Sequence, residues 1–92
     1  MTQIERIACY EAILDRAAAA VANLERALEA FAALEPQVRE LGAYYGSADW
    51  RRDLADDEAG RLPDELKRGV LSEDAAWNVL TDWDRLRERI AE

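Results

Sequence analysis

The side chains that could carry out chemistry gather in two stretches, residues 44–63 (YYGSADWRRDLADDEAGRLP) and residues 69–77 (GVLSEDAAW). Each stretch contains a glycine, then a serine, then an acid two residues later, then a tryptophan. A serine nucleophile needs a base, and the chain has no histidine, which excludes every His-based catalytic triad and every His-based metal site. Only the rarer lysine-dependent arrangement is left, and Lys67 is the sole lysine. We therefore expect no catalytic residue and no enzymatic activity.

The acids of the first stretch are the second candidate for chemistry. Four of them crowd the expected C-terminal end of a helix: Asp53, Asp56, Asp57 and Glu58. Negative charge is unfavourable there, because the helix dipole places its negative end at the C-terminus. Three explanations are open. Nearby arginines neutralise the cluster (Arg51, Arg52 and Arg61), or its oxygens bind a divalent cation, or it docks a basic partner. The spacing does not match an EF-hand loop.

Both stretches are also typical of helix junctions. The expected structural cap residues are Gly46 and Ser47 in the first stretch and Gly69 and Ser72 in the second. Glycine ends a helix because it adopts the left-handed conformation without a Cβ penalty, and the serine hydroxyl then accepts from an unpaired backbone N–H of the next helix. Leu71 before the second cap is expected to pack on Ala76. The tryptophans Trp50 and Trp77 would then be buried anchors of the helices that follow.

The apolar spacing predicts a long N-terminal helix. Ile7, Leu14, Val21 and Leu28 recur every seven residues, and Tyr10, Ala17, Leu24 and Phe31 follow three residues after each. This a/d pattern over four heptads is typical of a helix that lies along a partner helix. A flanking row widens the apolar face: Ile13, Ala20, Ala27 and Leu34.

These patterns together predict an all-α fold within a single domain, residues 1–92. We expect helices over about residues 3–34, 36–45, 47–57, 63–68 and 72–91, with Pro36 opening the second because proline fits the first position of a helix. The predicted architecture is a small antiparallel helical bundle, in which the long N-terminal helix pairs with the C-terminal one. The last helix is too short to cover the first completely. The middle segments or another copy of the chain must cover the rest, so a homodimer is an open alternative.

The charge distribution excludes several partners. The net charge is −8, and the basic residues form no cluster larger than a pair, so we expect neither nucleic-acid binding nor binding to an anionic membrane surface. No apolar stretch is long enough for a signal peptide or a membrane-spanning helix. A lone Cys9 suits a reducing compartment, so we expect a cytoplasmic protein. Nothing in the sequence calls for a cofactor.

Several motifs resemble a family of small bacterial proteins catalogued as domain of unknown function 4298. The resemblance is carried by MTQIERI, YYGSADW and DEAGRLPDELKRGVLSEDAAWNVL, and it covers essentially the whole chain. Its most specific parts are residues 44–47 with Trp50, and residues 66–72 with Asp74. The resemblance implies a cytosolic bacterial protein with an all-helical fold, and it implies no activity.

The function we predict is that of a non-catalytic protein-interaction module, an adaptor or regulatory subunit with an unidentified protein partner. The candidate interaction surface is the face formed by the helix junctions: Tyr44, Tyr45, Ser47, Asp49, Trp50, Asp53, Asp57, Glu58, Arg61, Lys67, Arg68 and Asp74. The alternative is a site for a small molecule or a divalent cation, built from the acidic and aromatic residues of the same junctions. Its oxygen ligands would be Asp49, Asp53, Asp57 and Asp74.

Overall fold

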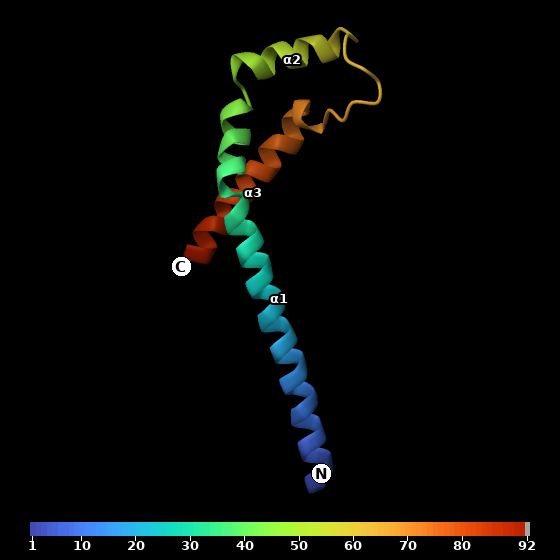
Figure 1. Cartoon of the computed structure of the whole chain (residues 1–92), viewed down its shortest axis with the longest axis vertical. Coiled ribbons are helices and arrows are strands. Elements are labelled where there is room, and N and C mark those ends of the chain that lie inside the picture. The colour runs from blue at the N-terminus through green and yellow to red at the C-terminus, as the bar shows by residue number, and fades with distance from the viewer. Residues whose placement is uncertain (92) are drawn as a thin grey trace. The chain divides into compact units, whose positions relative to one another are not determined.

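The computed structural model describes the backbone of residues 1–91 and the side chains of all of these except Glu73. Within these residues every regular element is helical, which confirms the all-α prediction: α1 Gln3–Tyr44, α2 Ala48–Glu58, the 3₁₀-helix η1 Gly69–Leu71 and α3 Glu73–Ala91 (Figure 1). The chain divides into a first unit, residues 1–35, and a second unit that begins at Pro36. None of the helices described is both long and apolar enough to cross a membrane.

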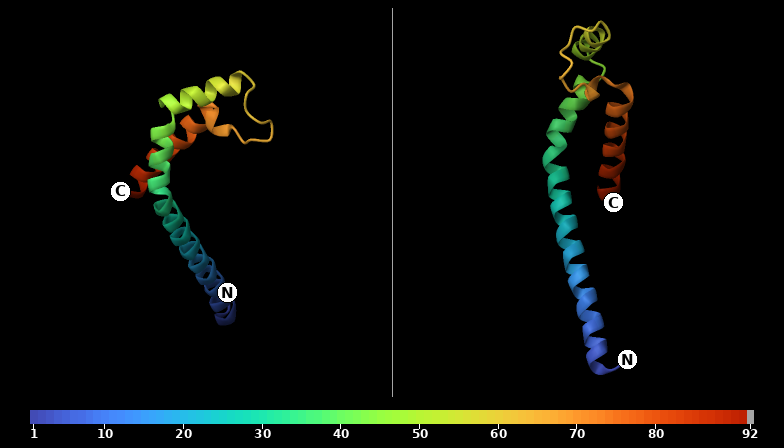
Figure 2. Two further views of the ribbon diagram at one scale, coloured as in Figure 1. Left: turned by 45° about the horizontal axis from the view of Figure 1, so that its top comes forward. Right: turned by 90° about the vertical axis from the view of Figure 1, so that its right-hand side faces the viewer.

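Helix α1 runs without a break for 42 residues, with Pro36 inside it (Figure 2). The prediction of two helices, 3–34 and 36–45, is therefore wrong. Proline has no N–H to donate to the carbonyl of Ala32 and usually ends or kinks a helix. Here the flanking sequences FAALE and QVREL are rich in strong helix formers, which favour continuation on both sides. Pro36 nevertheless coincides with the boundary between the two units.

The first unit keeps its apolar face exposed. Its side chains, all of which the structure describes, include none that is buried. Leu14 is 60% exposed, Val21 58% and Leu24 60%. The expectation that these residues form the core of a compact antiparallel bundle is therefore wrong. Heptad spacing identifies the face of a helix that needs a partner, but it does not say that the partner lies in the same chain.

The second unit has a small core to which three elements each contribute one residue. Trp50 of α2, Leu71 of η1 and Ala76 of α3 are the buried apolar side chains among the described residues. Helix η1 contacts both α2 and α3, so the core lies where these elements meet. Trp50 is thus the buried anchor that the sequence predicts. Trp77 is not, because it is 62% exposed. Successive helical residues are rotated by about 100°, and Ala76 takes the inward position instead.

The first junction has the predicted capping. Helix α1 ends at Tyr44, and Gly46 adopts a φ of 80°, in the left-handed region that favours glycine. The Ser47 hydroxyl then accepts a hydrogen bond from the backbone N–H of Trp50 at 3.1 Å, which caps α2. Asp49 lies in the first turn of α2, where the helix dipole favours an anion.

The second junction differs from the prediction. Residues 63–68 form a turn rather than a helix, with the N–H of Leu66 bonded to the carbonyl of Pro63 at 3.1 Å. Gly69 therefore has no helix to end: it begins η1, and its φ is not positive. The Ser72 hydroxyl lies 3.5 Å from the N–H of Ala75, a long and weak cap. The sequence analysis missed Gly60, which follows α2 with a φ of 72°.

Candidate functional site

The end of α1 is fastened to α2 by a short hydrogen bond. The Tyr44 hydroxyl donates to Oδ2 of Asp53 at 2.6 Å. This bond, together with partial burial and the negative charges of Asp53 and Asp49, raises the pKa of Tyr44 to about 12. The phenol therefore stays protonated at neutral pH, and one oxygen of Asp53 is engaged with it. The pair acts as a structural link between two helices.

Trp50 links α2 to two other segments. Its indole Nε1 donates to the backbone carbonyl of Val70 at 3.0 Å, which ties α2 to η1. Its ring lies edge-to-face against Tyr45, with the ring centroids 5.2 Å apart and the planes at 88°. A buried tryptophan needs a partner for its N–H, and here the chain itself supplies it. The indole is thus engaged in packing on the face that the sequence assigned to a partner.

The acids at the end of α2 are paired with arginines beyond the helix. Asp57 binds Arg68 at 2.9 Å, with the two side chains 27% and 31% exposed. Asp56 binds Arg61 at 3.1 Å, nearer the surface. The explanation by neutralising arginines is thus confirmed for Arg61, and the stronger partner is Arg68, which the sequence analysis did not connect with these acids. Pairing of this kind offsets the unfavourable interaction of the acids with the helix dipole.

The predicted oxygen ligands do not come together. Among the described residues, no group of three or more Asp, Glu or Cys side chains lies close enough to hold a metal ion. Asp53 is bonded to Tyr44, Asp57 to Arg68, and Asp49 lies 3.6 Å from Arg52 on the surface of α2. Asp74 is exposed at the start of α3.

The candidate interaction surface therefore separates into two groups. Tyr44, Ser47, Trp50, Asp53, Asp57 and Arg68 make the contacts that hold the second unit together. The remaining charged candidates are exposed: Asp49, Glu58, Arg61, Lys67 and Asp74. Sequence reasoning missed the backbone carbonyl of Val70 as a hydrogen-bond acceptor, and no side-chain pattern could have signalled it.

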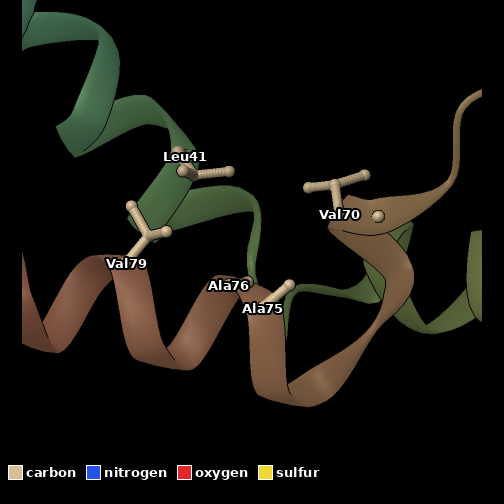
Figure 3. A pocket seen from close by; sticks show the side chains of 6 residues that line it. Leu41, Val70, Ala75, Ala76 and Val79 are labelled. Carbon is tan, nitrogen blue, oxygen red and sulfur yellow. The ribbon is translucent and has the colours of Figure 1, made fainter.

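Two hollows open on the second unit. The first, of about 320 Å³, has an apolar lining: Leu41, Gly69, Val70, Ala75, Ala76 and Val79. Figure 3 shows Leu41 and Val79 on one side of it and Val70 of η1 on the other. The second, of about 350 Å³, is lined by Tyr44, Asp53, Leu62, Leu66, Lys67, Arg68, Val70 and Leu71. Both hollows are open to solvent, and the second one combines apolar and charged side chains.

We compared the chain with curated proteins, with solved structures and with models of protein families, and one family model matches it. No curated protein and no solved structure matches the chain. The family model described as Domain of unknown function (DUF4298) matches residues 7–92. This range contains both junctions and all of the apolar heptad positions of α1, from Ile7 to Phe31. The protein therefore belongs to the DUF4298 family.

Proposed function

We propose that the protein is a non-catalytic protein-interaction module that binds a partner helix along α1. The observation that carries this proposal is the exposure of large apolar side chains on one face of the first unit. We call these residues the α1 stripe: Ile7, Tyr10, Ile13, Leu14, Val21, Leu24 and Leu28. Each of them is between 37% and 63% exposed.

An isolated helix with such a stripe is poorly stabilised. In water most helical stability in proteins comes from packing an apolar face, and soluble monomers rarely expose contiguous apolar patches larger than a few hundred Å². Full burial of one leucine, isoleucine or valine contributes about 1.5–3 kcal/mol. Covering the α1 stripe would thus stabilise the chain substantially. Because its residues follow heptad spacing, the surface that fits them is another helix with the same spacing.

The chemistry of the junctions supports a non-catalytic role. The chain has no histidine, and the phenol of Tyr44, with its pKa raised to about 12, is a poor proton donor or acceptor near neutral pH. Asp53 and Asp57 are both engaged with partners inside the second unit. Of the most specific motif residues, Tyr44, Ser47, Trp50 and Arg68 thus contribute to folding, and the α1 stripe is left as the largest apolar face without a described core.

Site-specific photo-crosslinking in the cells that naturally make the protein tests this proposal. A photoreactive residue replaces Leu24 in the α1 stripe or, as the matched control, Ala19 on the opposite face of the same helix. We expect crosslinks from position 24 only, and we expect the attached peptide to show apolar heptad spacing. Equal crosslinking from both positions, or none from position 24, would rule out the α1 stripe as the binding surface.

The second hollow supports the alternative, binding of a small molecule. Its lining combines apolar side chains with the ammonium group of Lys67, a combination that suits an apolar carboxylate. The test is a thermal melt with phenylacetate and, separately, with Ca²⁺, Mg²⁺ or Mn²⁺. A ligand at 100 times its Kd adds about 2.7 kcal/mol of stability. A rise in melting temperature that Lys67→Ala abolishes would support the hollow as a small-molecule site. An unchanged melting temperature with every probe would count against it.

A further inference from the structure

We infer that the helix bound by the α1 stripe is α1 of a second copy of this chain, parallel to the first and in register with it. The inference rests on the proposed function and names its partner. It is carried by the order of apolar residues along the helix and by the charges that flank them.

The apolar seam is continuous over the length that a coiled coil needs. The a positions are Ile7, Leu14, Val21 and Leu28, and the d positions are Tyr10, Ala17, Leu24 and Phe31. In a parallel, in-register pair each of these residues meets its own copy, so all eight layers are apolar and extend over about 37 Å.

The charges beside the seam distinguish the two orientations. In a parallel pair each g position faces the e position of the next heptad in the partner, which places Arg6 opposite Glu11 of the second copy. The following g–e pairs contain at least one apolar residue each: Ile13–Ala18, Ala20–Glu25 and Ala27–Ala32. No like charges meet. In an antiparallel pair e faces e, and Glu11 would lie opposite Glu25 of the other copy. The flanking charges thus favour the parallel pair.

The first experiment measures the mass of the full chain in solution by sedimentation over a range of concentrations. We expect a dimer for the wild type. In Leu14→Glu/Leu24→Glu the dimer should weaken by about a hundredfold or more, because it would bury four unpaired carboxylates. The control Ala12→Glu/Ala19→Glu has the same added charge on the opposite face and should remain dimeric. Fluorescence of the buried Trp50 checks that the second unit stays folded in each variant.

The second experiment tests orientation by disulfide formation in a Cys9→Ser background. A disulfide needs Cα atoms within about 7 Å of each other. Ile7→Cys and Leu28→Cys, prepared separately, should each crosslink to their own copy in a parallel, in-register pair. In the antiparallel pair position 7 faces position 31 of the partner. A mixture of Ile7→Cys and Phe31→Cys chains would then form the mixed disulfide, and we expect none.

The proposed ion pair between Arg6 and Glu11 of the second copy can be tested by exchanging its charges. Arg6→Glu should weaken the dimer about two- to fivefold, the size of effect expected of an exposed ion pair. Arg6→Glu/Glu11→Arg should restore it, because the attraction is rebuilt with the charges exchanged. A dimer that tolerates Arg6→Glu unchanged and gains nothing from the exchange would overturn the parallel assignment.

The outcomes separate this inference from the proposed function. A chain that is monomeric at every concentration, or a dimer that survives Leu14→Glu/Leu24→Glu, would overturn the inference. If position 24 of such a monomer crosslinks to a different protein, the interaction module stands and its partner is a foreign helix. If position 24 crosslinks neither to a second copy of the chain nor to a different protein, both proposals fail. A mixed disulfide between positions 7 and 31 would overturn the parallel register alone.

Discussion

From Pro36 onward the chain buries Trp50, Leu71 and Ala76 where α2, η1 and α3 meet, whereas residues 1–35 bury no side chain. In the second unit, hydrogen bonds and ion pairs also join residues far apart in sequence, such as Trp50 with Val70 and Asp57 with Arg68. In the first unit, the Thr2 hydroxyl accepts from the N–H of Glu5, only three residues away.

If α1 binds a partner helix as we propose, this difference separates folding from association within one short chain. Contacts between distant residues fix the second unit without help from outside the chain. The first unit has strong helix formers and a regular apolar seam, which specify a helix and the face on which a partner would pack. Substitutions in the second unit and at Pro36 should reveal whether that unit is held by its own contacts and whether the proline affects the stability of α1.

The largest expected effect is the loss of Trp50. Trp50→Ala removes a buried ring and its hydrogen bond to the carbonyl of Val70, and it should lower the free energy of unfolding by about 3–5 kcal/mol. Trp77→Ala is the matched control, because Trp77 is 62% exposed, and it should change stability by less than about 0.5 kcal/mol. Urea unfolding measures both. Equal losses for the two variants would show that the core has been wrongly located.

The next effect concerns the boundary between the units. Pro36→Ala restores an N–H that can donate to the carbonyl of Ala32, and alanine is the best helix former, so the middle of α1 should gain about 1–3 kcal/mol. Amide hydrogen exchange around residues 33–40 should slow accordingly. Gln37→Ala, at an exposed position beside the proline, should change exchange little. Faster exchange in Pro36→Ala would mean that the proline stabilises the helix where it stands.

The sequence predicts best the features that are determined by interactions between neighbouring residues. The left-handed Gly46 and the cap at Ser47 follow from the conformational freedom of glycine and the geometry of a serine hydroxyl, and both were predicted correctly. The helical class also follows from local propensity and periodicity. Gly69 was misplaced because the same glycine–serine pattern occurs there without a preceding helix to end.

The features that the sequence did not predict depend on contacts that no local pattern encodes. Continuity of α1 through Pro36 depends on a balance between one lost hydrogen bond and the propensities of many flanking residues. The pairing of Asp57 with Arg68 spans eleven positions and a turn that was predicted as a helix. For the α1 stripe, periodicity identifies the apolar face of the helix, but whether a partner lies inside or outside the chain is a question of tertiary structure.

Of the two ion pairs at the end of α2, the less exposed one should have the larger coupling energy. A double-mutant cycle with Asp57→Asn and Arg68→Gln should give a coupling energy of about 1–2 kcal/mol, because both side chains are mostly shielded and hydrogen-bonded. The matched cycle with Asp56→Asn and Arg61→Gln should give less than about 0.5 kcal/mol, because Arg61 is largely exposed. The reverse order would contradict the conclusion that Arg68 is the stronger partner of these acids.

The smallest effect is a loss of stability in alkali through Tyr44. Its pKa is raised from 10.0 to about 12 in the folded chain, chiefly by the hydrogen bond to Asp53, so the neutral phenol is favoured by folding. The contribution is therefore complete below pH 10 and is lost as the pH rises toward about 12, because the unfolded chain releases this proton first. Urea unfolding over this range should show a weaker decline in Tyr44→Phe than in the wild type. Tyr10→Phe, at an exposed position of the first unit, should keep the full decline. If it did not, the alkaline sensitivity would belong to the first unit, and the link between α1 and α2 would lose its role in holding the second.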